Sequence, residues 1–400
     1  MMRNEDSPSR VLLVVNAVLD DKKFHAIAAG TYPRKDYYEL REALDADILD
    51  LGALDKRGWT RILRRVVGAS LAQVVLARTR VSRYDAVFVD QETTGFALAA
   101  LLGRRRPRLV MIAHLLTPRK SLLSRALGLQ RKIDCMIVHS TLQQRQAERA
   151  LGLRPTQTAL VPYQTDDRFW SPRTAAVKKQ ICAVGLENRD YDTLIAAVRD
   201  LDVQVVVAAA SLWSTHDGVA DSKMLPPNVA IASFDYAGLR DLYAESLFIV
   251  VPLKEVENQS GITTILEAMA MGKAVVVSHT RGQTDVVRDR RHASRADPDR
   301  PTQPEWAHIL GATAQEPTGI YVRPGDPGEL QRAIAFLVAH PETARAMGRN
   351  GRQLLRETMS LDHFTERVAA LIVGRSPLSR GASATERAAM PEMQARAPVH

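Results

Sequence analysis

One carboxylate in an otherwise apolar helix restricts most strongly how this chain can fold. Residues 259–278 read QSGITTILEAMAMGKAVVVS, where Glu267 is the only charged residue before Lys273. The apolar run LFIVVPL precedes this segment and AVVVS ends it, which predicts a helix between two buried parallel strands. Because a charge without a partner is costly to bury, Glu267 predicts either a bound ligand or a structural ion pair.

The start of this predicted helix lies at the carboxyl edge of the sheet, where open α/β folds bind ligands. Ser260 is a candidate N-cap, and Gly261 lets the backbone approach a ligand closely. The N–H groups of Gly261, Ile262 and Thr263 then form a candidate phosphate site. Thr263 and Glu267 share one helical face, so we expect the Glu267 carboxylate to accept hydrogen bonds from the ribose of a nucleotide.

Three motifs in this half of the chain resemble the donor domain of nucleotide-sugar glycosyltransferases of the GT-B fold, the retaining family 4-like or group 1 enzymes. They are LEAMAMGKAVVVS, RGQTDVV from Arg281 and TGIYVRPGDPGELQRAI from Thr318, and the resemblance extends over residues 135 to 375. It implies a nucleoside diphosphate sugar as donor and an acceptor hydroxyl or amine. It also implies retention, no metal and no separate cofactor.

The resemblance assigns further residues to the donor. Gln259 stands where the family has a Glu that contacts the donor sugar, so Gln259 and its neighbour Ser260 are expected at the sugar. Arg189 matches a basic residue that binds the donor diphosphate. The family's preceding Arg is Leu186 here, so Lys254 is a candidate substitute. A surface location is the alternative for both cations.

The acceptor side is expected in the first half of the chain. His114 ends the strand-like run RLVMIAH and is a candidate to bind the transferred sugar or the acceptor, although a histidine at a strand end is often structural. Glu92, Asn16 and His25 follow other strand-like runs and are weaker candidates for acceptor contact. The carboxylates of Asp45–Asp47 lie where a helix gives way to a strand, so we expect no metal site there.

Strand-like and helical segments alternate along the chain, which predicts an α/β fold with parallel sheets. We expect two Rossmann-like, doubly wound domains facing a cleft, with residues 1–172 on the acceptor side and 173–375 binding the donor. Residues 288–316 are predicted to be an insertion and 376–400 a disordered tail. The expected strands are RVLLVVNAV, DADILDL, YDAVFVD, RLVMIAHL, DCMIVHS and TALVPY, then QICAVGL, VQVVVAAA, NVAIAS, LFIVVPL, AVVVS and GIYV.

The composition fits this architecture. The chain has 400 residues, 46% hydrophobic, which is enough for two cores. No stretch of eighteen apolar residues and no signal-peptide pattern is present, so we expect a soluble cytoplasmic protein. Cys135 and Cys182 each fall inside an apolar strand, which predicts buried thiols and no disulfide.

The positive charge is concentrated in the first half. Residues 1–172 contain 28 Lys and Arg against 18 Asp and Glu, whereas the remainder contains 26 against 27. A basic amphipathic helix is indicated by the stretch from Arg57, RGWTRILRRVVGASLAQVVLARTR. Such a helix either contacts the inner face of an anionic membrane or simply packs on a sheet. Nucleic acid is not expected, because no aromatic residues are interleaved with the basic ones.

Two functions remain as alternatives to sugar transfer. A sugar-nucleotide epimerase of the same fold would need no acceptor. A degenerate binding or scaffold protein is suggested by Gln259 and Leu186, which replace charged residues of the family pattern. The donor sugar, its base and the acceptor are not identified by the sequence, because few side chains set specificity in a cleft.

Overall fold

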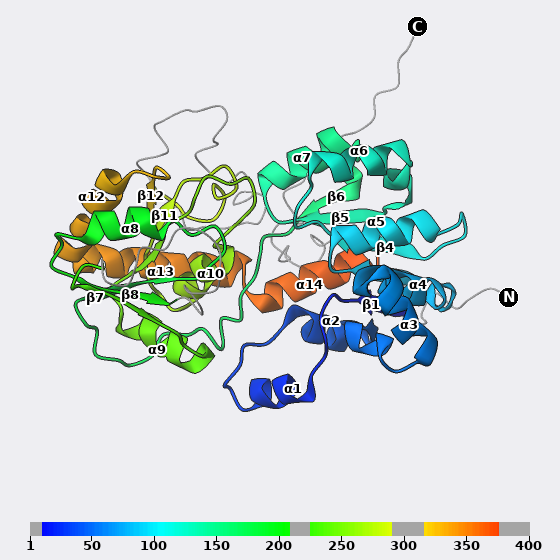
Figure 1. The fold of residues 1–400 in the computed structure, drawn as a ribbon, viewed down its shortest axis with the longest axis horizontal. Coiled ribbons are helices and arrows are strands. Elements are labelled where there is room, and N and C mark those ends of the chain that lie inside the picture. The colour runs from blue at the N-terminus through cyan, green and yellow to red at the C-terminus, as the bar shows by residue number, and fades with distance from the viewer. Residues whose placement is uncertain (1–9, 209–224, 290–315, 376–400) are drawn as a thin grey trace, which may run out of the picture.

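The computed structural model describes residues 10–208, 225–289 and 316–375, and in them two six-stranded parallel sheets (Figure 1). The first sheet has the order β2-β1-β3-β4-β5-β6 and the second β12-β11-β10-β7-β8-β9. The first contains β1 Val11–Val14, β2 Asp47–Leu49, β3 Ala86–Val89, β4 Arg108–Ile112, β5 Cys135–Val138 and β6 Thr158–Leu160. The second contains β7 Gln180–Val184, β8 Gln204–Ala208, β9 Val229–Ala232, β10 Ile249–Val251, β11 Val275–Ser278 and β12 Gly319–Val322.

Helices connect these strands. Around the first sheet are α1 Asp21–Ala28, α2 Asp36–Leu44, α3 Gly58–Val67, α4 Ala69–Arg78, α5 Glu92–Leu101, α6 Pro118–Ala126 and α7 Thr141–Leu151. The later helices are α8 Tyr191–Val198, α9 Tyr236–Glu245, α10 Ile262–Ala270, α12 Pro327–Ala339, α13 Pro341–Thr358 and α14 Leu361–Ile372. The alternation of strands and helices confirms the predicted α/β class, and each predicted apolar run contains a strand.

The strand order reverses once in each sheet, between β1 and β3 and between β7 and β10. The loops that follow those strands diverge at these points and leave a crevice at the carboxyl edge. The two carboxyl edges face each other. Thr141, after β5, donates its N–H and its hydroxyl to Asp285, after β11, at 2.6 and 3.1 Å. Ligand sites are therefore expected between the two sheets.

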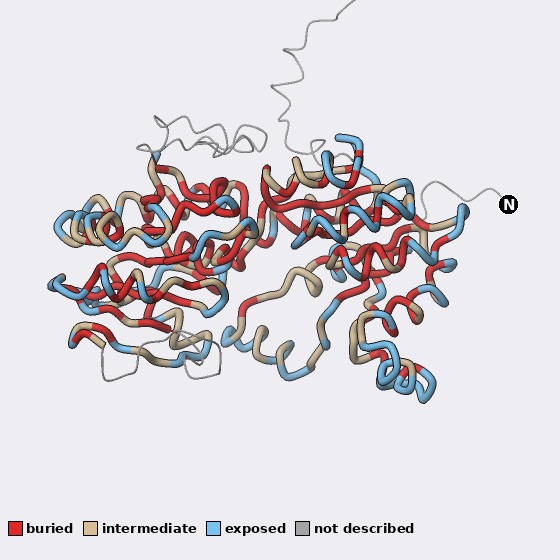
Figure 2. The backbone as a smooth tube through the Cα atoms, turned by 45° about the horizontal axis from the view of Figure 1, so that its top comes forward, coloured by how far each residue is buried: buried red, intermediate tan, exposed pale blue. Residues whose placement is uncertain are grey.

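Apolar side chains cover both faces of both sheets. The central strands of both sheets are buried, whereas the outer strands β2, β6 and β9 are partly exposed; Figure 2 shows the buried backbone inside each domain and exposed backbone in the surrounding helices. Cys135 and Cys182 are buried free thiols, as predicted. None of the helices in the described part of the chain is long and apolar enough to cross a membrane.

The chain crosses between the two domains twice. The first crossing follows β6 and the second joins α13 to α14, and the two run side by side where Thr165 pairs with Ser360. Arg34 holds both crossings: its guanidinium donates to Asp166 at 2.8 and 3.0 Å and to Asp362 at 2.9 Å. One partly buried cation therefore ties both crossings to the loop between α1 and α2.

The last helix returns to the first domain (Figure 1). Phe364, Val368 and Ile372 of α14 are buried in the same apolar cluster as Leu13 and Phe88 of the first sheet. The range 173–375, predicted for the second domain, thus includes a helix that completes the core of the first.

One predicted helix is wrong. The amphipathic stretch from Arg57 is divided into α3 and α4, because Gly68 has φ 84° and ψ 166°, a conformation that ends a helix. The predicted tail, 376–400, and all but the ends of the predicted insertion, 288–316, lie outside the described residues. The division of the chain at residue 172 stays a prediction.

Replacing Phe364 by alanine tests the role of α14. The side chain is 2% exposed, so its loss should cost ~3–5 kcal/mol and lower the melting temperature clearly. Glu366→Ala, an exposed change on the same helix, should leave the melting temperature nearly unchanged. Equal melting temperatures for the two variants would show that α14 does not complete this core.

Candidate functional site

A cavity of about 500 Å³ lies at the switch point of the second sheet. The loop after β7 forms one side, the start of α10 the floor, and the start of α9 the other side. Four predicted donor residues line it together: Arg189, Gly261, Thr263 and Glu267. The structure therefore brings the main residues of the predicted donor site to one place, and we refer to it as the donor cavity.

Gly261 begins α10 with an open N-terminus. It is the N-cap residue with φ 80°, and a Cβ at this position would lie 2.8 Å from Val251 Cγ1, so only glycine fits. No side chain caps the helix, and the N–H groups of Gly261, Thr263 and Thr264 donate to no described residue. The predicted N-cap, Ser260, is thus wrong by one position. These free amides and the helix dipole favour an anion.

Ile262, predicted as part of the same anion site, contributes differently. Its N–H donates to Gln259 O at 3.2 Å, and its side chain is buried against the sheet. The candidate anion site therefore comprises the amides on either side of Ile262.

Arg189 lies beneath the donor cavity and is 8% exposed. Its guanidinium donates to Val184 O at 2.8 Å, to Glu187 O at 2.9 Å and to Thr264 Oγ1 at 3.1 Å. It forms no ion pair with any carboxylate of the described residues, and burial lowers its pKa. A buried cation without a counter-ion is stabilised by a bound anion.

Glu267 lies one turn into α10 and lines the same cavity. Tyr243 donates its hydroxyl to Glu267 Oε2 at 2.9 Å. Burial raises the pKa of Glu267 to about 7, against the opposing effects of this hydrogen bond and of the charges of Lys35 and Arg189. The structural ion pair considered as an alternative is not formed with any described Lys or Arg, so most of the carboxylate's hydrogen-bonding capacity is available to a ligand.

The first domain reaches the edge of the donor cavity through one short segment. The rings of Tyr32 and Tyr236 pack edge to face with centroids 4.7 Å apart, and Tyr236 lines the cavity. The Lys35 ammonium lies over both rings, 5.0 and 5.8 Å from their centroids. Sequence analysis missed these residues and Tyr243. The spacing of Tyr236 and Tyr243, seven apart on α9, was the available signal.

The remaining donor candidates lie on the loop between β10 and α10. Gln259 is 7% exposed, and neither atom of its side-chain amide finds a partner among the described residues. The Ser260 hydroxyl accepts from Asn188 Nδ2 at 2.8 Å and donates to Asn258 at 2.9 Å, so it is already engaged. Lys254 is exposed, and its backbone N–H bonds Asn188 O. Leu186, 48% exposed, lines the cavity where the family pattern has an arginine.

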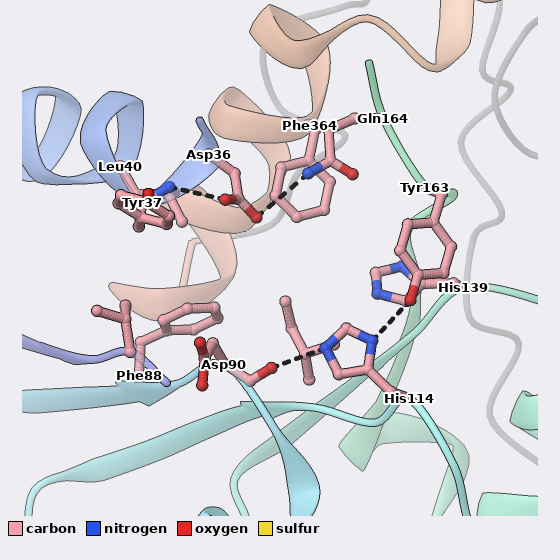
Figure 3. Close-up of a pocket in the computed structure, with 12 residues that line it drawn as sticks. Asp36, Tyr37, Leu40, Phe88, Asp90, His114, His139, Tyr163, Gln164 and Phe364 are labelled. Atoms are coloured by element: carbon pink, nitrogen blue, oxygen red, sulfur yellow. Dashed lines mark hydrogen bonds between the residues drawn. The ribbon is translucent and has the colours of Figure 1, made fainter. Parts of the chain in front are cut away.

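His114 is at the carboxyl edge of the first sheet, beside a second cavity (Figure 3). Its Nε2 lies 2.9 Å from Asp90 O and its Nδ1 2.7 Å from the Tyr163 hydroxyl. A carbonyl only accepts, so Nε2 carries a proton and donates. The ring is held in one orientation at the edge facing the second domain.

The three weaker acceptor candidates have other contacts. Glu92 accepts from Lys120 Nζ at 2.6 Å and from the His114 N–H at 3.0 Å. Burial alone would raise the pKa of Glu92, but these bonds outweigh it and hold the pKa below its usual value. Asn16 donates its side-chain amide to Gln91 and its backbone N–H to Asp90. His25 is exposed on α1 and lines neither cavity. Neither Glu92 nor His25 lines either cavity, and the acceptor roles of these residues stay predictions.

The Asp45–Asp47 segment lies where α2 ends and β2 begins. Asp45 ends α2 with a left-handed conformation, φ 46°, and Asp47 begins β2. In the described ranges no group of three or more His, Cys, Asp or Glu is arranged to hold a metal ion.

The raised pKa of Glu267 makes stability depend on pH. A carboxyl whose pKa rises from 4.5 to about 7 on folding is neutral at low pH and is ionised at a cost as the pH increases through this interval. Glu267→Gln should therefore stabilise the ligand-free protein by on the order of 2 kcal/mol at pH 8 and by almost nothing at pH 4.5. Thermal unfolding at both pH values measures this. A gain that is equal at both pH values, or matched by the exposed control Glu366→Gln, would contradict it.

Comparisons with known proteins agree with this geometry. The model of the family described as glycosyl transferases group 1 matches residues 178–340, which contain the whole donor cavity. No curated protein sequence matches the chain significantly.

Solved structures similar to the chain share its fold at low identity. Sucrose-phosphate synthase from Thermosynechococcus elongatus is 15% identical with a TM-score of 0.62, over 91% of this chain and 98% of that one. HepE from Anabaena, in complex with UDP-glucose, is 14% identical with a TM-score of 0.61, over 91% and 99%. A glycosyltransferase from Rickettsia africae is 12% identical with a TM-score of 0.60, over 92% and 100%. Residues 178–340 are thus similar to the glycosyl transferases group 1, and the chain as a whole has the two-domain GT-B fold of these solved structures.

Proposed function

We propose that this protein transfers a sugar from a nucleoside diphosphate sugar to a hydroxyl or amine of an acceptor. One observation carries this proposal: the uncapped start of α10 lies beside the unpaired, buried guanidinium of Arg189. The two come close together, because a Cβ on Gly261 would lie 3.4 Å from Arg189 Nη1. Free amides and a buried cation at one point suit a diphosphate, which becomes more negative as the sugar leaves.

The rest of the cavity suits a nucleotide. Glu267, one turn behind the amides, is placed to accept hydrogen bonds from a ribose diol. Phe234 lines the opposite side with 40% of its surface exposed, which suits a flat base. HepE was solved with UDP and with UDP-glucose, so uridine nucleotides are the first donors to test.

We propose retention and no metal requirement. Arg189 and the start of α10 supply positive charge where the diphosphate would leave, with Lys254 as a nearby surface cation. The leaving phosphate can then accept the proton of the attacking acceptor, so no separate base is needed. Gln259 has an unpartnered buried amide that a donor sugar can satisfy, and His114 faces the same region from the first domain.

The fate of the donor distinguishes a transferase from the two alternatives, an epimerase and a degenerate scaffold. An epimerase would change the sugar nucleotide without releasing a nucleoside diphosphate. A degenerate scaffold would release none and transfer nothing, and the loss of charge at Gln259 and Leu186 is the observation that favours it. Release of the diphosphate together with a glycosylated acceptor supports the transferase alone.

Nucleotide binding tests the donor site directly. UDP should raise the melting temperature of the full chain even with a metal chelator present, because a ligand that binds only the folded state stabilises it. GDP, ADP, CDP and dTDP are compared in the same screen. No shift with any of them would contradict the proposed function.

Glu267→Ala should weaken binding of the stabilising nucleotide by about 1–3 kcal/mol, the range for losing a charged hydrogen-bond partner. Glu257→Ala, on the exposed loop before α10, is the control and should bind as the parent does. A Glu267→Ala protein that binds normally but melts earlier would assign Glu267 a structural role instead.

We further propose that α3 contacts an anionic membrane surface. The exposed fractions of Ile62 and Val66 are 65% and 76%. Arg57, Arg61 and Arg65 are exposed on the same helix and its N-cap. Exposed apolar side chains flanked by cations suit the boundary between acyl chains and anionic headgroups.

A liposome assay tests this contact. The protein should sediment with vesicles containing phosphatidylserine at low salt, and less with neutral vesicles. The double variant Ile62→Glu, Val66→Glu should lose most of this binding. Phe336→Glu, an exposed apolar position on α12 of the second domain, should retain it. Equal binding by both variants would exclude α3 as the contact.

A further inference from the structure

The first domain holds a second cavity of about 100 Å³ at the switch point of its sheet. It lies between the carboxyl ends of the strands, α2 and α14 (Figure 3), and we refer to it as the acidic cavity. Its apolar walls come from both sheet and helices. Its polar lining includes Asp36, Asp90, His114, His139, Tyr163 and Gln164.

Two carboxylates face this cavity from opposite sides, Asp36 from α2 and Asp90 from the end of β3 (Figure 3). Asp36 accepts from the Tyr37 N–H at 2.9 Å and from Gln164 Nε2 at 3.2 Å. Asp90 Oδ2 accepts from the Asn16 N–H at 2.6 Å, whereas its Oδ1 is shielded from solvent and has no partner among the described residues. Neither carboxylate forms an ion pair with a Lys or Arg of the described chain.

Neither imidazole of the cavity forms an ion pair with these carboxylates. His139 is 3% exposed, and its Nδ1 lies 2.8 Å from Val161 O, so it donates there and leaves Nε2 free as an acceptor. Burial lowers the pKa of His139 to about 3, which keeps the ring neutral. His114 needs only one ring proton to satisfy both of its bonds, to Asp90 O and to Tyr163.

The nearest lysine in the sequence is directed elsewhere. Lys35 precedes Asp36, but its ammonium lies over the rings of Tyr32 and Tyr236 at the donor cavity. Burial raises the pKa of Asp36, and burial together with the charge of Asp36 raises that of Asp90 to about 7. Two buried carboxyl groups with unused hydrogen-bonding capacity destabilise the ligand-free protein, and a bound cation would remove this destabilisation.

We propose that the acidic cavity binds a primary ammonium group of the acceptor between Asp36 and Asp90, with His139 Nε2 as a further hydrogen-bond acceptor. This inference rests on the proposed function. A volume of about 100 Å³ takes only the end of a ligand that carries this group. The rest of the acceptor extends toward the donor cavity, because Lys35 and Asp36 are adjacent and face the two cavities.

The bound ammonium is a recognition group and not the nucleophile. A protonated amine has no free electron pair, so it cannot attack the donor sugar while the carboxylates hold it. The attacking atom is then a hydroxyl oxygen of the same acceptor. This narrows the acceptor from a hydroxyl or amine to an amino alcohol or amino sugar that is glycosylated on oxygen.

Calorimetric titration of the full chain with glucosamine tests the proposal, with N-acetylglucosamine as the neutral match. Glucosamine should bind at pH 7.5 and N-acetylglucosamine should not. Asp36→Asn and Asp90→Asn should each weaken glucosamine binding at least tenfold. The control Asp202→Asn changes a carboxylate that is 95% exposed and should bind as the parent does. Equal binding of the two sugars, no binding of glucosamine, or unchanged binding in both cavity variants would overturn the proposal.

A second test places a lysine ammonium in the acidic cavity in place of the ligand's ammonium. Gln164→Lys places an ammonium beside Asp36, where the amide now donates, and Gln164→Met is its uncharged match. The lysine variant should melt at a higher temperature than the methionine variant and should no longer bind glucosamine. A lysine variant that melts below the methionine variant would overturn the proposal.

UDP binding is measured in parallel and keeps the two proposals apart. All variants of the acidic cavity should retain the UDP-dependent rise in melting temperature, since the donor cavity is unchanged. Glucosamine binding without any nucleotide binding would support the acidic cavity while contradicting the donor site. Nucleotide binding without glucosamine binding would support the donor site while contradicting the acidic cavity.

Discussion

Hydrogen bonds and ion pairs from Arg34 to the two interdomain crossings hold in place the segment of the first domain that borders both cavities. The Arg34 guanidinium bonds Asp166 on the first crossing and Asp362 at the start of α14, and it also pairs with Glu39 on α2. These contacts fix the loop between α1 and α2 against both crossings. The residues directly before and after Arg34 are therefore held in register with both domains, and they include Tyr32, Lys35 and Asp36.

The two cavities have opposite electrostatic needs. The donor cavity contains a buried cation, Arg189, without a counter-ion, whereas the acidic cavity contains Asp36 and Asp90 without a cation. Each group would cost less free energy if it were replaced by a neutral one. Buried charged groups without a partner are typical of ligand-binding sites, where they lower the stability of the free protein but favour binding of the ligand. The donor cavity thus offers a cation to a negative ligand group, with Glu267 beside it as a hydrogen-bond acceptor, whereas the acidic cavity offers two carboxylates to a positive group.

The sheets and the donor cavity were largely predictable because they are encoded locally. Buried parallel strands are continuous apolar runs, and Gly261 and Glu267 lie in one helix between two of them. Arg189 was assigned through the family resemblance. The acidic cavity was not predicted, because it combines Asp36, Asp90 and Gln164 from segments far apart in the sequence. Asp90, the last residue of the strand-like run VFVD, was the visible signal, but the sequence analysis singled out Glu92 two residues later.

The return of α14 has a consequence for synthesis on the ribosome. The six strands of the first sheet are complete by Leu160, yet Phe364, Val368 and Ile372 belong to that sheet's core. The surface that they cover stays open until some two hundred further residues have been translated. The first domain is therefore synthesised first, but its core is completed only after the second domain has been synthesised. The second domain must emerge and fold while the apolar surface that α14 later covers is still exposed to chaperones and to other nascent chains.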